Sequence, residues 1–338
     1  MASIYDVAAA AGVSITTVSH VYSGNRHVAA DTVARVMEAA RDLDYSPRLS
    51  ARALATGRSM ILGVCFPAGC SLLHRNPYFP ALLEGLSAAA GKLGYGFLLI
   101  PNALGENGVN QGELLGQLDG VIIADPAEND VRLAAFLDRD LPVITVGRWM
   151  SRQDVPWVDN DHSRAIKDLF VHLDEQGYER PLLLNKRPTI SYESDVEHAF
   201  QKETAARGQS GRTVWCDDFF SQKTYDVARE ILTAADRPDV IIASTDSQAL
   251  SVLQAASDLG IAIPDELGVV GEGETVLAAS SIPPLTSIRV FPDKLGDLAV
   301  ALMLDLLNGG NGDRTKLVPV ELVVRASTDR KSGVNVRS

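Results

Sequence analysis

Apolar residues in the first 45 positions recur at helical spacing and lack the alternation of a strand. Ser3 and Asp6 form a capping-box pattern, which predicts a helix that begins there and runs through alanines to Gly12. Ser14–Tyr22 predicts a second helix with Ser14 as its N-cap. A third helix is expected from about Asp31, because apolar residues follow at helical spacing: Val33, Val36, Met37 and Ala40.

After Met60, short apolar runs alternate with longer amphipathic stretches. Strands that are apolar on both faces and alternate with helices indicate parallel βαβ sheets. About 280 residues is long for one such sheet, so we expect two similar lobes. Gly309–Gly312 predicts a late surface loop. The expected strands are 61–66, 96–100, 120–124, 142–146, 181–184, 239–244 and 267–271, and the expected helices are 79–93, 163–176, 225–235 and 248–259.

The composition is that of an ordinary globular protein, with 46% hydrophobic and 22% charged residues. The longest apolar runs are strand-sized, which argues against a membrane helix. The N-terminal stretch has no basic region and carries Asp6, so we expect no signal peptide. Three cysteines without a C-x-x-C pattern fit a reducing compartment, and the expected location is cytoplasmic: Cys65, Cys70 and Cys216.

The net charge of −12 argues against a general nucleic-acid binder, but it is unevenly distributed. The first 58 residues hold six basic and five acidic side chains, a net charge of +1, whereas the remainder has a net charge of −13. We therefore expect any contact with a polyanion to lie in the N-terminal part. A charge of +1 supports this only weakly.

A helix, a tight turn and a second helix within residues 4–22 have the geometry of a DNA-reading helix-turn-helix. Ala8 is small where the helices approach, and Gly12 can take the left-handed conformation of the turn. The outer face of the second helix is short and polar, as entry into a major groove requires. An ordinary αα-hairpin is the alternative. The expected core comprises Val7, Val13, Val18 and Val21.

The N-terminal run at 4–24, together with 45–47 and 53–59, resembles the headpiece and hinge of the LacI/GalR family of bacterial transcriptional repressors. The resemblance continues through 76–86, 242–250, 263–271 and 282–289 and covers almost the whole chain. It implies an all-α helix-turn-helix headpiece (1–46), a hinge helix (47–58), and an α/β, two-lobed, periplasmic-binding-protein-like effector domain with parallel sheets (59–338). It also implies a homodimer on double-stranded, pseudo-palindromic operator DNA, regulated by a small-molecule effector.

By this resemblance, Ile15, Thr16 and His20 face base edges. The family usually has Arg at position 20, which grips guanine with two donors, so His20 is a departure. A second set contacts mainly phosphates and fixes the register: Tyr5, Ser14, Thr17, Ser19, His27 and Thr32. In the hinge, Leu54 matches the family's minor-groove wedge, with Ala51 and Ala55 permitting close approach and Arg48 supplying charge. A plain polar linker is the alternative for this segment.

Effector candidates by position are Phe79, Asp125, Arg148, Tyr192, Val196, Phe219, Thr245, Asp246 and Glu272. Sugar-binding members usually have Arg where Val196 stands and Asp where Gly273 stands. Because those groups grip vicinal hydroxyls, we expect simple monosaccharides to bind weakly. Asp195 or Glu274 could replace the lost pair. Arg148 leaves an anionic ligand possible.

Other chemical motifs are incomplete. The stretch from Gly85 to Lys92 has the wrong spacing for a phosphate loop, and Gly271–Gly273 lacks the third glycine of a dinucleotide site. We find no G-x-S-x-G and no histidine pair at metal-binding spacing. The acidic clusters at 159–161 and 217–218 predict turn and N-cap roles. The prediction is thus a regulator with no enzymatic activity, cofactor or metal.

Two other protein classes compete with this prediction. An α/β enzyme would need a catalytic constellation, and a solute-binding protein would need an export signal in place of Ser3–Tyr22. The C-terminal tail lacks the apolar heptads that build a tetramer bundle, so the expected assembly is a dimer.

Overall fold

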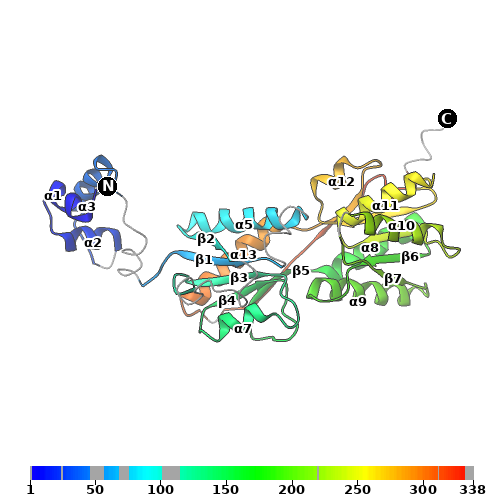
Figure 1. Ribbon diagram of the computed structural model, residues 1–338, viewed down its shortest axis with the longest axis horizontal. Helices are drawn as coiled ribbons and strands as arrows, with labels where there is room; N and C mark the ends of the chain where they lie inside the picture. The colour runs from blue at the N-terminus through cyan, green and yellow to red at the C-terminus, as the bar shows by residue number, and fades with distance from the viewer. Residues whose placement is uncertain are drawn as a thin grey trace.

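The computed structural model describes residues 2–23, 26–45, 57–67, 76–100, 115–218, 221–310 and 312–331. Three helices form an N-terminal headpiece, and two α/β lobes follow it (Figure 1). The predicted hinge residues Arg48, Ala51, Leu54 and Ala55 and the effector candidate Phe219 lie outside the described residues.

The headpiece consists of α1 (Ile4–Ala11), α2 (Ile15–Ser23) and α3 (Ala30–Asp42). The Asp6 carboxylate accepts the backbone N–H of Ser3 at 2.8 Å, which closes the predicted capping box. Gly12 ends α1 with φ of 65°, the left-handed conformation expected of it. The Ser14 hydroxyl accepts the backbone N–H of Thr17 at 3.0 Å and so caps α2. These predictions of helix ends are confirmed.

The headpiece core is built from small apolar residues of all three helices. Val7, Val18 and Val36 are fully buried, and the predicted Val13 and Val21 are partly buried against them. Met37, expected on the inner face of α3, is 44% exposed instead. Val36 already faces the core, and the inner face continues through two alanines one turn later, Ala39 and Ala40.

The first lobe, called the N-lobe, has a six-stranded sheet in the order β11-β5-β4-β3-β1-β2. All its strand pairs are parallel. The helices α5 and α13 pack against each other and close one core of this lobe (Figure 1). Its elements are β1 (Ile61–Cys65), α5 (Tyr78–Lys92), β2 (Gly96–Leu99), β3 (Gly120–Ala124), α7 (Val131–Leu137), β4 (Val143–Val146), β5 (Trp157–Asn160), α13 (Pro292–Leu307) and β11 (Thr315–Val318).

The second lobe, called the C-lobe, repeats this plan with the sheet order β12-β10-β9-β8-β6-β7. Its strand pairs are parallel except for β10 and β12, which are antiparallel. The prediction of two similar parallel-sheet lobes is confirmed. Its elements are α8 (His162–Gln176), β6 (Pro181–Asn185), α9 (Ser191–Ala206), β7 (Arg212–Trp215), α10 (Gln222–Thr233), β8 (Val240–Ala243), α11 (Asp246–Asp258), β9 (Gly268–Glu272), α12 (Val276–Ser280), β10 (Thr286–Arg289) and β12 (Glu321–Val323).

The chain crosses between the lobes three times, at 160–162, 289–292 and 318–321. In Figure 1 the last crossing is part of the long reddish segment that runs from the N-lobe into the C-lobe. The backbone N–H of Asp161 donates to the carbonyl of Val318 at 3.0 Å, so the first and third crossings lie side by side. Residues at these crossings therefore belong to the boundary where a ligand would meet both lobes.

The crossing of α5 and α13 depends on two glycines. A Cβ on Gly85 would lie 2.8 Å from the Cα of Asp293, and one on Gly296 would lie 2.5 Å from the carbonyl carbon of Gly85. The two backbones thus touch where any side chain would clash. Gly85, rejected above as part of a phosphate loop, has a packing role inside a helix.

Within the residues that the structure describes, no single helix is long and apolar enough to span a membrane. The pair α1 and α2 reaches that length and composition only jointly, with a bend of 104° between the helices.

Candidate functional site

The second helix of the headpiece presents a polar face to solvent. Ser14 and Thr16 are exposed, and Ile15 between them is 39% exposed. Val18, on the opposite side of the same helix, is fully buried in the headpiece core. The helix therefore holds its polar face outward by burying its apolar one, as a DNA-reading helix must.

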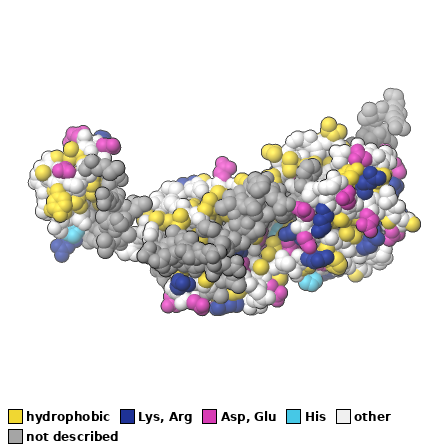
Figure 2. Space-filling view, in the orientation of Figure 1, with side chains coloured by type: hydrophobic (Ala, Val, Ile, Leu, Met, Phe, Trp, Pro, Cys, Tyr) yellow, Lys and Arg dark blue, Asp and Glu magenta, His cyan; other side chains and the backbone are white. Residues whose placement is uncertain are grey.

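A hollow on the headpiece surface brings several predicted contact residues together. It is lined by residues from α2 and from the segment that leads into α3, including the predicted Ser14, Thr17, His20, His27 and Thr32. The same hollow includes Arg26, which sequence reasoning did not single out. Figure 2 shows basic and histidine side chains gathered at this end of the headpiece. Tyr5, another predicted contact, is 67% exposed on α1.

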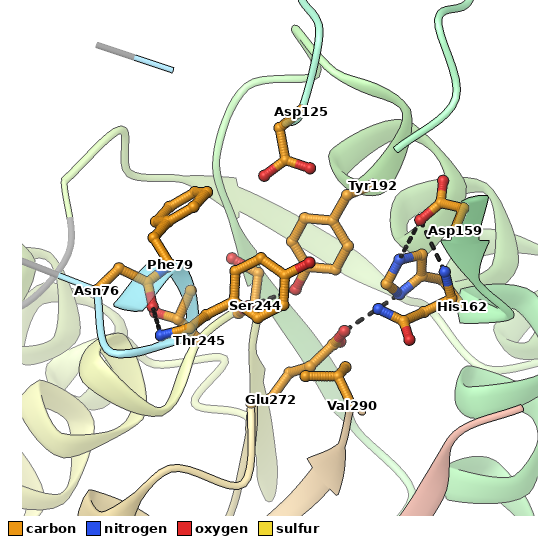
Figure 3. Close-up of a pocket in the computed structure, with 13 residues that line it drawn as sticks. Asn76, Phe79, Asp125, Asp159, His162, Tyr192, Ser244, Thr245, Glu272 and Val290 are labelled. Atoms are coloured by element: carbon orange, nitrogen blue, oxygen red, sulfur yellow. Dashed lines mark hydrogen bonds and ion pairs between the residues drawn. The ribbon is translucent and has the colours of Figure 1, made fainter. Parts of the chain in front are cut away.

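A cavity lies between the two lobes, with about 520 Å³ of free space including the part open to solvent. Strand ends of both sheets and the first two crossings contribute to it (Figure 3). Ligands of open parallel sheets bind at such carboxyl ends. The lining residues are Asn76, Tyr78, Phe79, Asp125, Asp159, Asn160, His162, Tyr192, Ser244, Thr245, Glu272, Gly273 and Val290.

His162 joins the lobes at the base of this cavity. Its Nε2 lies 3.4 Å from Asp159 Oδ1 at the end of β5, and its Nδ1 lies 3.1 Å from Glu272 Oε1 at the end of β9. Burial by itself would lower the pKa of His162. The hydrogen bonds and charges of Asp159 and Glu272 outweigh burial and raise that pKa to about 10. The imidazole is therefore a cation held between carboxylates of two sheets.

Asp125 follows β3 and directs its carboxylate into the cavity (Figure 3). Its backbone is left-handed, with φ of 44°, and the neighbouring Gly147 leaves room for it. Within the described part of the chain, no hydrogen bond or ion pair reaches its carboxylate. Burial, followed by the charges of Asp159 and Glu193, raises the pKa of Asp125 to about 7, against the opposing effect of Lys186 and His162.

Aromatic rings form walls of the cavity. Tyr78 and Phe79 contact each other edge to face at 5.3 Å between ring centroids. Tyr192 packs edge to face against His162 at 4.7 Å, and its hydroxyl donates to the carbonyl of Ser244. The cavity thus combines flat apolar surfaces with a few fixed polar groups, as small-molecule sites do.

Five of the nine effector candidates line the cavity: Phe79, Asp125, Tyr192, Thr245 and Glu272. Three others are not among its lining residues. Arg148 forms an ion pair with Asp195 across the lobes at 2.7 Å. Val196 is buried in the apolar core of the C-lobe. Asp246 accepts hydrogen bonds from Ser287 of β10 and from Thr275 at the start of α12, and so joins these two elements.

Asp195 and Glu274 could replace the Arg and Asp with which sugar-binding members of the family hold hydroxyl groups. Both already form ion pairs. Asp195 pairs with Arg148, and Glu274 pairs with Arg325 and with Arg289. Both carboxylates are therefore already neutralised by guanidinium groups.

Sequence reasoning missed several cavity residues, among them Asp159, Asn160 and His162. The cluster at 159–161 was interpreted as turn and N-cap residues, and this holds for Asp161, which accepts the backbone N–H of Arg164 at 3.0 Å. Asp217 instead accepts the backbone N–H of Arg187 at 3.0 Å, a bond to a residue distant in the sequence and not a local turn or N-cap bond. Among the described residues, no group of three His, Cys, Asp or Glu side chains could hold a metal ion.

A helix-turn-helix headpiece followed by two parallel-sheet lobes around a cavity defines a DNA-binding protein whose second part is built like a periplasmic binding protein. Residues 3–48 match the family of bacterial regulatory proteins described as the lacI family. Residues 170–328 match the periplasmic binding protein-like domain. The chain belongs to the lacI family and is a DNA-binding transcriptional regulator.

The similarity to known proteins covers almost the whole chain. The HTH-type transcriptional repressor PurR of Photobacterium profundum is 29% identical over 340 residues, which cover 97% of this chain and 98% of that protein. The HTH-type transcriptional regulator pepR1 of Lactobacillus delbrueckii subsp. lactis is 29% identical over 337 residues, which cover 97% of this chain and 98% of that protein. The crystal structure of the lac repressor dimer bound to operator and the anti-inducer ONPF has a TM-score of 0.80 at 24% identity, covering 97% of this chain and 99% of that one. That structure shows the shared fold.

Proposed function

We propose that this protein represses transcription as a homodimer on a pseudo-palindromic operator, and that a small molecule in the interlobe cavity sets its affinity for that operator. The observation that carries the proposal is the outward polar face of α2 on a headpiece that matches the lacI family. In the lac repressor structure, a dimer holds operator and anti-inducer together, which supports the same arrangement here. The two states would differ in the relative position of the two headpieces.

In this proposal Ile15, Thr16 and His20 read base edges, while Tyr5, Ser14, Thr17, Ser19, His27 and Thr32 position the headpiece on phosphates. The hollow supports the phosphate role of four of them, Ser14, Thr17, His27 and Thr32, since phosphate-binding residues must lie on one continuous face. Ser14 also caps α2, so its hydroxyl has both a local and an intermolecular role. The roles of Arg48, Ala51, Leu54 and Ala55 in the hinge, including the Leu54 wedge, stay predictions.

The cavity supports the effector part of the proposal. It touches both sheets and two of the three crossings, so a bound molecule would contact the groups that set the relative position of the lobes. His162 already links β5 to β9 there. A ligand that contacts one state of the lobes differently from the other shifts the equilibrium between them.

His20 offers the sharpest test of the reading helix. We expect duplexes selected from a randomised pool by the wild-type protein to differ from those selected by His20→Arg at one position in each half-site. Arg should favour guanine there, because it can donate to O6 and N7 together, and a good bidentate contact is worth about 1–3 kcal/mol of discrimination.

Glu38→Gln is the matched control, because Glu38 is exposed on α3 and lies outside the hollow. It should select the same sequences as the wild-type protein. If His20→Arg selects those sequences as well and with unchanged affinity, residue 20 does not face the bases.

A further inference from the structure

Three carboxylates line the interlobe cavity, and two of them are already engaged. Asp159 accepts the backbone N–H groups of Asn160 at 2.8 Å and Arg148 at 3.1 Å and lies beside His162. Glu272 pairs with His162 from the other side. Asp125 has no such partner in the described structure, although its carboxylate points into the cavity (Figure 3). Among these three carboxylates of the described lining, Asp125 is therefore the unpaired one.

A second unpartnered acceptor lies in the same cavity. Asn160 is 5% exposed, and its side-chain Oδ1 has no hydrogen-bond partner among the described residues. A buried acceptor without a donor is costly, and such groups in native structures mark strained or ligand-binding positions. Asp125 and the Oδ1 of Asn160 thus both require a donor, and Asp125 also carries charge.

The cations near the cavity are each matched to a carboxylate. Arg148 pairs with Asp195 at 2.7 Å, and Lys186 pairs with Glu193 at 2.9 Å. His162, the cation among the described lining residues, is shared by two carboxylates. An anionic ligand would find no unmatched cation on this lining and would face Asp125. Arg148, which left an anionic ligand possible, is thus already paired with Asp195.

The raised pKa of Asp125 also favours a cationic ligand over an anionic one. Burial and neighbouring negative charge raise its pKa to about 7, so its ionised form is poorly compensated in the unliganded protein. A neutral hydroxyl could donate one hydrogen bond to it. An ammonium or amidinium group would donate a charge-assisted bond and neutralise the carboxylate, which is the stronger interaction. The aromatic faces of Tyr78 and Phe79 add favourable surroundings for such a cation.

We propose that the interlobe cavity binds a small organic cation, an amine or amidine on a ring-sized body, with the cationic group on Asp125 and a donor on Asn160. The body of the ligand packs against Tyr78, Phe79 and Tyr192. This inference rests on the proposed effector function and names the chemical class of the effector.

The test uses probes that share one body and differ in charge. Calorimetry of the full chain at about pH 8, where Asp125 is ionised, compares benzylamine with benzyl alcohol and benzoate. A second series compares cyclohexylamine with cyclohexanol and cyclohexanecarboxylate, and glucose serves as a neutral polyol. Each amine should bind at least tenfold more tightly than its neutral and anionic counterparts. Asp125→Asn should abolish that preference.

Asp168→Asn is the matched control, because it removes one carboxylate from an exposed i,i+4 pair on α8 and leaves the cavity lining intact. It should keep the wild-type preference for amines. Asp125→Ser provides a second variant, and thermal unfolding identifies which variants are folded. The proposal is overturned if a neutral or anionic probe binds as tightly as its amine, if the preference survives in a folded Asp125 variant, or if neither amine binds at millimolar concentration.

Duplex binding by the wild-type protein is measured on the same preparation without probes. Absence of any sequence preference there would contradict the proposed DNA function, whatever the probes show. Sequence-specific duplex binding together with a failed charge series would contradict the ligand class alone.

Discussion

At the scale of single residues, the interlobe boundary holds buried charges whose surroundings differ sharply. His162 is compensated on two sides, whereas Asp125, with a pKa raised to about 7, has no partner in the described structure. A compensated charge stabilises the fold, and an uncompensated one destabilises it until a ligand or a proton arrives. The two residues therefore have opposite effects on the stability of the unliganded protein near neutral pH.

His162 makes stability depend on pH in a defined window. Because its pKa is raised from 6.5 to about 10 on folding, its contribution is fully present below about pH 6.5 and is lost as pH rises towards 10. Asp125 titrates around pH 7 and has lost its proton by about pH 8, and burial lowers the pKa of His172, so His162 dominates the pH dependence between about pH 8 and 9. We expect the melting temperature of the wild-type protein to fall across pH 7 to 9 by at least about 3 °C, on a scale of about 2–4 °C per kcal/mol. Scanning calorimetry measures it.

His162→Gln should lower the melting temperature at pH 7 and flatten this dependence. His198→Gln is its control, since His198 is exposed on α9 and its side chain lies within hydrogen-bond distance of Ser194 on the same helix. A fall of equal size in His162→Gln and in the wild-type protein would show that His162 is not the group responsible.

At the scale of elements, local signals predicted the headpiece well. The Ser3–Asp6 pattern, Gly12 and Ser14 act within one or two turns of chain, so the sequence contains all the atoms involved. The strands missed by sequence reasoning are short and lie late in the chain or carry polar residues, for example β5, which ends in Asp159 and Asn160. Their place in the sheets comes from pairing with distant strands. The cavity role of 159–162 could not be predicted for the same reason.

The contact of α5 and α13 shows a packing requirement that no local pattern reveals. Gly296→Ala would place a methyl group against the backbone of Gly85. We expect it to destabilise the N-lobe by about 1–3 kcal/mol, as overpacked contacts do, although Ala favours a helix over Gly by about 1 kcal/mol. Urea unfolding of the full chain, followed by circular dichroism, measures the difference.

Gly91→Ala supplies the comparison on α5, because a Cβ there meets nothing within 4 Å. It should be neutral or mildly stabilising. Equal midpoints for Gly91→Ala and Gly296→Ala would mean that the two helices separate at no cost.

At the scale of the whole molecule, the chain separates the DNA-binding headpiece from the proposed ligand cavity. The headpiece has the polar face that a groove requires, and the strongly acidic remainder contains the cavity. Three crossings join the lobes, two of them line that cavity, and His162 lies on the first. The sequence predicted the two lobes from the rhythm of strands and helices. It could not predict that Arg148 and Asp246 would be engaged by Asp195 and Ser287, since those partners are distant in sequence.

The central claim is that this chain recognises a specific operator through two headpieces. Genomic fragments retained by the full-length protein at physiological salt, then sequenced, test it most directly. The account predicts that retained fragments share an inverted repeat, because a two-fold dimer presents α2 to two symmetric half-sites. Retention of fragments in proportion to their abundance, with no shared sequence, would contradict it.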